Sequence, residues 1–235
     1  MVNLKQRSSL KELLDSDDIP FDDIKQNMKE LNTINTFLGG HAITVAGVKE
    51  ILKRLQGNKA ITICEIGCGG GDNLRTINSW CSTNKIPVQF IGIDIKKECI
   101  DFAKSKCAHL NVIWIQKNYA AASFGTSKPD IIFSSLFCHH FSNCDVVNML
   151  RWMKLNCSKG FFINDLHRHP LAYYSISWIT KLFSSSYLVK NDAPLSVARS
   201  FTQKEWQKLF DLTGIKNYTI QWKWAFRHLI IYRHE

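Results

Sequence analysis

The sequence predicts an α/β protein built on a mainly parallel β-sheet with helices on both faces. From residue 60 onward, short apolar runs alternate with segments of helical periodicity, as expected when buried strands are joined by crossover helices. Near the C-terminus two strand-like runs lie close enough to form an antiparallel hairpin. The five earlier apolar runs cover residues 61–66, 88–93, 112–115, 131–133 and 161–163.

The segment before the first strand is predicted to be helical. Leu10, Leu13 and Leu14 share one helical face, and a second periodic stretch runs from Ile24 to Leu38 before a Gly-Gly pair. A third helix is predicted over residues 42–55. We therefore expect an N-terminal helical cap over residues 1–57 and a main domain over residues 58–235.

Within the main domain, helices are predicted over residues 73–81, 98–107 and 145–155. The alternation breaks after the fifth strand, where residues 170–200 are rich in aromatic residues and serine. We expect an insertion there, forming a lid over residues 168–202. A helix over residues 203–212 and a hairpin of residues 218–224 and 226–232 complete the domain.

The net charge and the cysteine content restrict the kind of protein this can be, but they do not identify its binding partner. The net charge is +10, and residues 150–235 alone hold 13 Lys and Arg against 5 Asp and Glu. Such a surplus suits an anionic substrate, a nucleic acid or an acidic membrane face equally well. The 8 cysteines form no C-x-x-C pair and the polar start lacks an apolar signal core, so we expect reduced thiols and a cytoplasmic protein.

The most informative motif is a glycine-rich loop between the first strand and the following helix. It reads Glu65-Ile-Gly67-Cys-Gly69-Gly-Gly71, and its glycines allow the backbone to turn sharply and approach a ligand closely. The G-x-G-x-x-G fingerprint of NAD-binding proteins fails here because Asp72 or Leu74 occupies its third glycine position. No Gly-Lys-Ser/Thr follows, so a P-loop is excluded as well.

An acidic residue ends the second predicted strand. Asp94 lies 23 residues beyond Gly71, at a position where a carboxylate accepts hydrogen bonds from both hydroxyls of a ribose. The alternative is that Asp94 caps the next helix. The glycine loop and this acid together carry more information than either does alone.

Glu65-Ile-Gly-Cys-Gly-Gly-Gly71 followed by Gly-Ile-Asp94-Ile resembles the class I S-adenosylmethionine (SAM)-dependent methyltransferases. The resemblance implies a Rossmann-like, seven-stranded sheet with one antiparallel strand in its last hairpin, SAM as methyl donor and S-adenosylhomocysteine as product. It places the three alternate glycines of the loop under the methionine portion of SAM and Asp94 at the ribose. It also implies cofactor contacts for Glu65, Gly67, Gly69, Gly71, Ile95, Asn118, Tyr119 and Ser135.

Four histidines follow the fourth and fifth predicted strands, which end at the same edge of the sheet. We expect a histidine there to deprotonate a phenol or enol acceptor, with His140 and His167 as first candidates and His139 as a third. The alternative is that these side chains only shape the pocket or cap helices. Cys138, His139, His140 and Cys144 are metal-ligand types without the usual zinc spacing, so no metal is expected.

A looser resemblance concerns the acceptor. Asn35–His41 and Asp165–Tyr173 are similar to segments of bacterial methyltransferases that act on polyketide- or quinone-type aromatic compounds. This implies methyl transfer to oxygen or carbon of a small aromatic acceptor bound by His41, Arg168 and Tyr173. Arg168, Lys190 and Arg199 are candidates for holding an acidic group of the acceptor.

Other functions stay open at this point. RNA or protein methylation would use the basic last third, although no RNA-binding module is recognisable and nucleic acid is therefore not the expected partner. A catalytically silent SAM-fold binding protein is a further alternative, as is peripheral membrane contact through residues 170–200. We expect a monomer or a homodimer.

Overall fold

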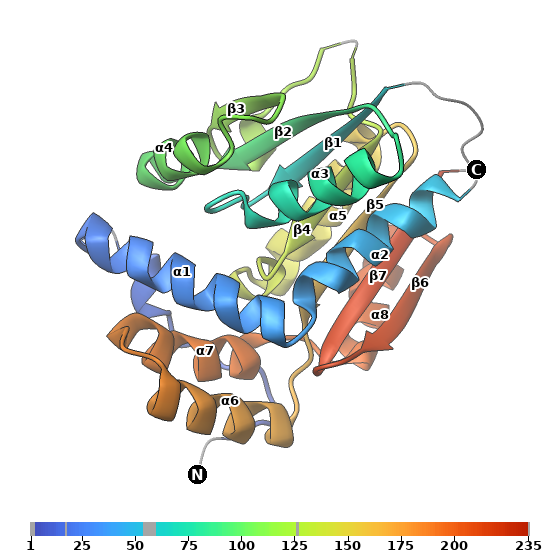
Figure 1. Ribbon diagram of the computed structural model, residues 1–235. Helices are drawn as coiled ribbons and strands as arrows, with labels where there is room; N and C mark the ends of the chain where they lie inside the picture. The colour runs from blue at the N-terminus through green and yellow to red at the C-terminus, as the bar shows by residue number, and fades with distance from the viewer. Residues whose placement is uncertain (1–2, 17, 54–59, 126, 235) are drawn as a thin grey trace.

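The computed structural model describes residues 3–16, 18–53, 60–125 and 127–234, and its centre is a seven-stranded sheet (Figure 1). The strand order is β3-β2-β1-β4-β5-β7-β6. Six strands run parallel, and β7 is antiparallel to both of its neighbours, with Arg227 paired to Leu166. The predicted α/β fold with its C-terminal hairpin is therefore confirmed. The strands are β1 (Ile61–Ile66), β2 (Val88–Asp94), β3 (Val112–Gln116), β4 (Ile131–Ser135), β5 (Gly160–Leu166), β6 (Tyr218–Lys223) and β7 (Arg227–Arg233).

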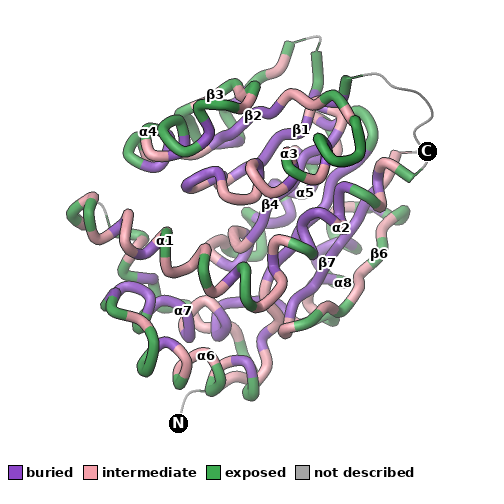
Figure 2. The backbone as a smooth tube through the Cα atoms, viewed as in Figure 1, coloured by how far each residue is buried: buried purple, intermediate pink, exposed green. Residues whose placement is uncertain are grey.

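Each face of the sheet is covered by helices, and the central strands are buried while the edge strands β3 and β6 and the outer helical faces are partly exposed (Figure 2). Successive strand residues point to opposite faces, so Ile63 and Phe162 pack with α2 (Gly40–Leu52) and α3 (Asp72–Thr83). Ile163 packs on the opposite face with α5 (Asn143–Asn156) and α8 (Gln203–Thr213). Helix α4 (Lys97–Lys106) packs on β2 and β3.

Residues 170–200 add two regular helices and no strand to the sheet. Helix α6 (Pro170–Phe183) begins with a proline at its first position, where no backbone N–H is needed. Helix α7 (Tyr187–Arg199) begins after Ser186, whose hydroxyl accepts a hydrogen bond from the N–H of Val189 at 3.3 Å. Together with α1 (Phe21–Phe37), these helices lie beyond the carboxyl ends of the parallel strands (Figure 1).

The N-terminal segment differs from the prediction at one point. Instead of a helix through Leu10, Leu13 and Leu14, the chain is extended with a single 3-10 turn, η1 (Leu13–Asp15). The reason is a tertiary contact: the N–H groups of Leu13 and Leu14 donate to the carboxylate of Asp192 on α7, at 2.8 and 3.0 Å. The predicted domain boundary at residue 57 lies outside the described residues, and the division into cap and main domain stays a prediction.

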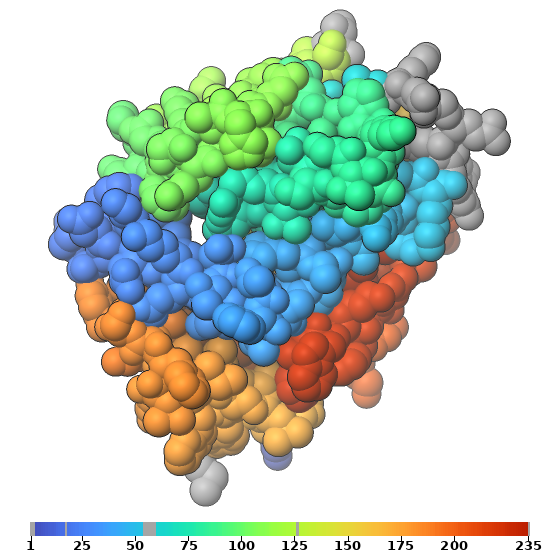
Figure 3. Space-filling model, viewed as in Figure 1, coloured from blue at the N-terminus to red at the C-terminus, as the bar shows by residue number. Residues whose placement is uncertain are grey.

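Figure 3 shows the N-terminal helices, in blue, between the green β2–β3 region and the orange α6–α7 region. Phe21 of α1 makes an edge contact with Phe102 of α4, and α1 also packs against α7. The N-terminal segment therefore bridges both sides of the strand-end edge. None of the described helices is long and apolar enough to span a bilayer.

Candidate active site

The glycine loop connects β1 to α3 at the carboxyl edge of the sheet. Gly67 has a φ of 68°, and a Cβ there would lie 2.3 Å from the ring of Phe137, so only glycine fits. Gly69 also has a positive φ, 48°, but a Cβ on it would meet no atom within 4 Å. The loop therefore packs against the ring of Phe137 at Gly67, whereas no atom covers it in the Cβ direction of Gly69. The backbone at Gly69 is thus accessible to a ligand.

Asp94, the last residue of β2, braces this loop. Its Oδ2 accepts a hydrogen bond from the N–H of Gly69 at 2.9 Å, and its Oδ1 accepts one from the N–H of Lys96 at 3.0 Å. Burial raises the pKa of Asp94, an effect that these N–H groups partly offset. The residue that caps α4 is Lys96, so Asp94 is not the helix N-cap. Each carboxylate oxygen keeps a second lone pair for a ligand hydroxyl, and the neighbouring Ile95 is 65% exposed.

Glu65 is buried beside the loop with one oxygen unused. Its Oε1 accepts a hydrogen bond from Asn73 Nδ2 at 2.7 Å, whereas Oε2 has no partner among the described residues. Burial raises the pKa of Glu65 well above its ordinary value. Such an oxygen suits a cationic amino group, which would supply the missing donor and the missing charge.

His41 lies behind Glu65 and outside the larger cavity described below. Its Nδ1 is 2.9 Å from Asn73 Oδ1, and its Nε2 is 2.8 Å from Asn32 Oδ1. The side chains of Asn32, His41, Asn73 and Glu65 therefore form a chain of polar contacts from α1 to β1. In this geometry His41 positions the glycine-loop region rather than the acceptor.

The remaining cofactor candidates occupy different environments. Asn118 is exposed, and its Oδ1 accepts a hydrogen bond from the N–H of Ala120 at 3.0 Å. The ring of Tyr119 makes edge contacts with Phe137, Phe141 and Trp152, so it lies in the core rather than at the surface of the crevice. Ser135 is buried at the end of β4, where its hydroxyl accepts a hydrogen bond from Asn164 Nδ2 at 3.4 Å.

A cavity of about 420 Å³ lies beyond the ends of β4 and β5. Its volume is within the range of small-molecule sites, roughly 300–1,000 Å³. The walls come from α1, α6, α7 and the turn before β7, and they are mostly aliphatic. Nine polar side chains interrupt that apolar lining: Glu12, Asn27, Asn35, His139, His140, Ser175, Asp192, Ser196 and Arg227.

His139 is held in a defined orientation by Asp165. It belongs to η3 (Cys138–His140), directly after β4, and its Nδ1 lies 2.7 Å from Asp165 Oδ1. The backbone N–H of His139 donates to the other carboxylate oxygen of Asp165 at 3.0 Å. Burial alone would raise the pKa of Asp165, but the charge and hydrogen bond of His139 hold it below its ordinary value. An ionised carboxylate on Nδ1 leaves Nε2 as the nitrogen that can take a proton.

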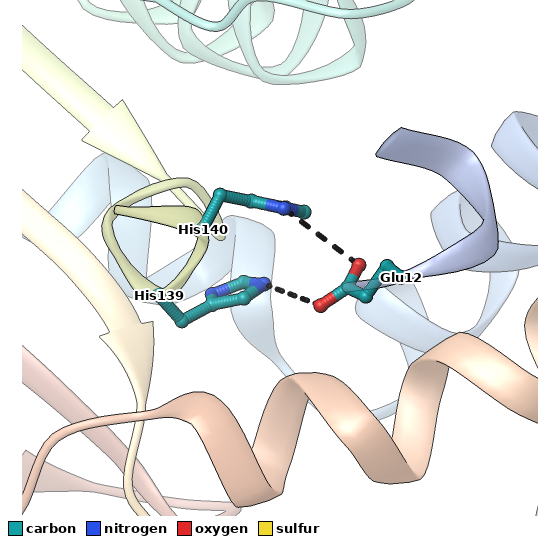
Figure 4. Close-up of side chains that lie close together, drawn as sticks. All are labelled: Glu12, His139 and His140. Atoms are coloured by element: carbon teal, nitrogen blue, oxygen red, sulfur yellow. Dashed lines mark ion pairs between the residues drawn. The ribbon is translucent and has the colours of Figure 1, made fainter. Parts of the chain in front are cut away.

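The Nε2 side of His139 is occupied by Glu12, which comes from the extended N-terminal segment (Figure 4). Glu12 Oε1 is 3.7 Å from His139 Nε2, and Oε2 is 3.8 Å from His140 Nδ1. Burial raises the pKa of Glu12. His140 is also 3.2 Å from Asp15, whose carboxylate accepts a hydrogen bond from Arg199 Nη1 at 2.8 Å.

The structure does not gather into one cluster the four residues of metal-ligand type noted in the sequence, Cys138, His139, His140 and Cys144. Cys138 is buried with its Sγ 3.4 Å from Ser134 Oγ, and Cys144 is exposed on α5. Glu12 instead joins the two histidines, with ligand atoms within 4.8 Å of one another. The guanidinium of Arg199 lies 3.8 Å from Glu12 and already supplies positive charge to this group.

Three predicted residues lie outside the cavity. The ring of His167 stacks near that of His228, with centroids 4.6 Å apart, and burial together with nearby cationic groups lowers its pKa. Arg168 is buried and donates to the Leu4 carbonyl at 3.0 Å and to Glu205 at 2.7 Å, so it is a structural residue here. Tyr173 makes an edge contact with Tyr174. None of these three side chains lines the cavity of about 420 Å³.

Seven polar residues of the site were not singled out from the sequence: Glu12, Asn27, Asp165, Ser175, Asp192, Ser196 and Arg227. Asp165 had a usable signal, because an acid that ends one strand lies beside a histidine that follows the adjacent strand. Glu12 and Arg227 are 215 residues apart in the chain, and nothing local to either sequence position indicates that they share a cavity.

Comparison with known proteins agrees with this geometry. Residues 63–160 match the family model of a methyltransferase domain. The matched segment holds the glycine loop, Asp94 and His139, and SAM is the cofactor that this domain implies. No curated protein matches the chain.

Several methyltransferases are among the solved structures of similar fold. The plantazolicin methyltransferase BpumL, in complex with SAH, is 19% identical with a TM-score of 0.66, covering 88% of this chain and 74% of that one. The magnesium protoporphyrin IX methyltransferase ChlM from Synechocystis PCC 6803, with bound SAM, is 9% identical with a TM-score of 0.55, covering 87% and 84%. The CurJ carbon methyltransferase is 14% identical with a TM-score of 0.60, covering 81% of this chain and 53% of that one.

Proposed function

We propose that the protein transfers a methyl group from SAM to oxygen or carbon of a small, apolar, aromatic or polyketide-like acceptor. The observation that carries the proposal is the His139–Asp165 pair in the wall of an apolar cavity, one strand end away from the glycine loop. Phe137 links the two regions, because it packs under Gly67 and lies two residues before His139. Structures of similar fold that act on plantazolicin, magnesium protoporphyrin IX and carbon centres are consistent with a small-molecule acceptor.

The residues at the glycine loop fit SAM. When bound, SAM supplies a methyl group on a positively charged sulfur, which departs as a neutral thioether. The open backbone at Gly69, the spare lone pairs of Asp94 and the exposed Ile95 would hold the ribose and adenine side of the molecule. The unpartnered Oε2 of Glu65 would take the cationic amino group.

The cavity residues perform the acid–base part of the reaction. Nε2 of His139 removes the proton from a hydroxyl or enol of the acceptor, and Asp165 stabilises the imidazolium that forms. The aliphatic walls exclude water and orient the acceptor, which is where most of the rate increase arises when the methyl donor is intrinsically reactive. Of the three predicted histidines, His139 lines the cavity and makes the shortest contact with a buried carboxylate, 2.7 Å to Asp165.

A membrane surface is a second partner that one observation favours. Trp178 is 69% exposed and Phe183 is 82% exposed, and both belong to α6, which is itself one of the helices that wall the cavity. An exposed aromatic face of this kind suits the interfacial region of a bilayer and a lipophilic acceptor. Flotation with anionic vesicles tests this: Trp178→Ser should reduce recovery, and failure of the wild type to float would exclude the contact.

The decisive test of the proposed function is calorimetric titration of SAM and SAH into the purified chain. We expect micromolar binding that Asp94→Ala abolishes, because the variant loses both the brace on Gly69 and the ribose acceptor. Asp101→Ala is the matched control, since Asp101 is an exposed acid on the adjacent helix α4. Absence of binding to the wild type would overturn the methyltransferase function and favour a silent binding protein.

A further inference from the structure

The guanidinium of Arg227 is buried in the cavity wall without an anionic partner. Arg227 is the first residue of β7 and is only 3% exposed. Nη2 donates one hydrogen bond, to Asn35 Oδ1 at 2.9 Å, while Nε and Nη1 have no hydrogen-bond partner among the described residues. No described carboxylate forms an ion pair with it within 4.0 Å. Burial lowers the pKa of Arg227 to about 10, so the group is still cationic at neutral pH.

A second unsatisfied side chain lines the same cavity. Asn27 on α1 is 1% exposed, and neither its Oδ1 nor its Nδ2 has a hydrogen-bond partner in the described part of the chain. Buried polar groups are nearly always hydrogen-bonded, and a buried charge without a counter-charge costs several kcal/mol. Two such groups in one ligand-sized cavity indicate that a ligand completes them.

The acidic residues nearby are already engaged. Asp165 is committed to His139, and both oxygens of Asp192 accept hydrogen bonds from the N-terminal backbone. Glu12 accepts a hydrogen bond from Ser196 Oγ at 2.8 Å and lies 3.8 Å from Arg199. Asp165 attracts Arg227 only through space, and no described carboxylate contacts its Nε or Nη1, so these donors are open to an anionic ligand.

We propose that the cavity takes an acceptor bearing a carboxylate, which pairs with Arg227 and is flanked by Asn27. A carboxylate matches the paired donors of a guanidinium and brings a negative charge into contact with an arginine that has no ion-pair partner among the described residues. The acceptor's reacting hydroxyl or enol then lies toward His139. This inference rests on the proposed function for the identity of the ligand as acceptor, and it replaces Arg168, Lys190 and Arg199 as the expected holders of an acidic group.

The apolar remainder of the acceptor has room to extend. A second cavity of about 390 Å³ shares Ile34, Leu38 and Ile179 with the first and continues between α1 and α6. Phe37 and Phe183 flank it at the surface, where they are 83% and 82% exposed. The ligand class is thus an amphiphilic acid, with its charge at Arg227 and its apolar body along α1 and α6.

The test compares acids with their neutral, isosteric carboxamides. Binding of 2-naphthoate, 6-hydroxy-2-naphthoate and decanoate, and of the three carboxamides, is measured calorimetrically to the full chain with and without saturating SAH. We expect at least one acid to bind ten times or more tightly than its amide. Arg227→Met should remove this preference, and Arg227→Lys should keep part of it because the charge remains and the planar fork is lost.

Arg151→Met is the matched control, since Arg151 is an exposed arginine that donates to the Leu212 carbonyl. It should leave the acid preference unchanged. Removing an unpaired buried charge does not threaten the fold, so Arg227→Met should have a melting temperature no lower than that of the wild type without ligand. That melting temperature separates loss of recognition from loss of structure.

The outcomes separate this inference from the proposed function. Lack of any acid preference across the three pairs would overturn the carboxylate site, even when SAM binds normally. Weaker SAM binding in Arg227→Met would overturn it too, because Arg227 would then hold the carboxylate of the cofactor. Acid preference lost in Arg227→Met, without SAM binding to the wild type, would support the anion site and contradict only the methyltransferase function.

Discussion

Two groups of histidines follow neighbouring strands of the sheet, and they differ in the charges that surround them. After β4, His139 and His140 face carboxylates: Asp165 is 2.7 Å from His139, and Glu12 lies on its other side. After β5, His167 stacks near His228, and none of the ion pairs among the described residues includes either ring. Burial followed by the neighbouring His167 lowers the pKa of His228 to about 4.

The difference shows that proximity to the strand ends does not by itself make a histidine catalytic. A carboxylate on one ring nitrogen stabilises the protonated form, so His139 is suited to accept a proton during the reaction. At His228, burial and the neighbouring His167 outweigh the attraction of Asp165, and at His167 burial, His169 and Arg168 outweigh that of Glu205. Both rings are therefore suited to stay neutral. Of the histidines that follow β4 and β5, only the two after β4 form ion pairs with carboxylates among the described residues.

The largest expected effect comes from His139→Asn. The asparagine Nδ2 can replace the ring Nδ1 as a donor to Asp165, so the variant should fold while losing Nε2. We expect kcat to fall roughly 10²- to 10⁴-fold, the usual contribution of a general base, with the Kd for SAM unchanged.

His167→Asn is the paired control and should keep kcat within about threefold of wild type, the scatter expected for a residue without a role in proton transfer. Single-turnover methyl transfer measures both variants. An equal fall in kcat in His139→Asn and His167→Asn would show that the two groups of histidines do not differ in catalytic role.

Acid should destabilise the protein through the second cluster. The folded-state pKa of His228, about 4, is below the ordinary 6.5, so the unfolded chain binds the proton more readily. Stability should therefore decrease as the pH falls from about 7 to about 4, by at most about 3 kcal/mol from this residue.

His228→Gln, which cannot titrate, should flatten the dependence of the unfolding free energy on pH between those limits. Urea unfolding at pH 7.0, 5.5 and 4.5 provides the measurement. A variant whose stability still declines in parallel with wild type would show that His228 is not the group responsible.

A smaller loss is expected from Asp165→Asn, which keeps the shape of the pair and removes its charge. The imidazolium of His139 then lacks its stabilising carboxylate, and kcat should fall about tenfold to a hundredfold, at the low end of acid–base contributions. The pH profile of kcat distinguishes this from a structural effect, because its acidic limb should move. An unchanged profile with a lower melting temperature would indicate that Asp165 acts on folding alone.

The position of the glycine loop and of Asp94 in the fold could be predicted because the signals for it are local. Glu65, the loop glycines and Asp94 are confined to 30 residues, and strand-to-helix transitions on either side fix where they lie. The strands were found because buried parallel strands consist of short apolar runs. The positions of the strands and of the glycine loop in the sequence can therefore be predicted without knowing how distant parts of the chain pack.

The acceptor side was not predictable in the same way. Glu12, Asn27, His139 and Arg227 come from four separate segments, and only the packing of α1 and α7 on the strand ends brings them together. The N-terminal segment also departs from its helical pattern, because Asp192 captures the backbone N–H groups of Leu13 and Leu14. Tertiary contacts of this kind override local propensity, and no spacing in the sequence reports them.

The reversed direction of β7 determines which part of the last strand lines the cavity. Because β7 runs against its neighbours, it begins beside Leu166, where β5 ends, and Arg227 lies at the same edge as the glycine loop. A parallel β7 would carry its first residue to the opposite edge, about 20 Å away at the rise of a strand. The residues of the short turn before Arg227 lie outside the strand pairs of β7. Under the proposed function, substitutions in this turn would therefore change the cavity wall, and with it the choice of acceptor, while the strand pairs stay in place.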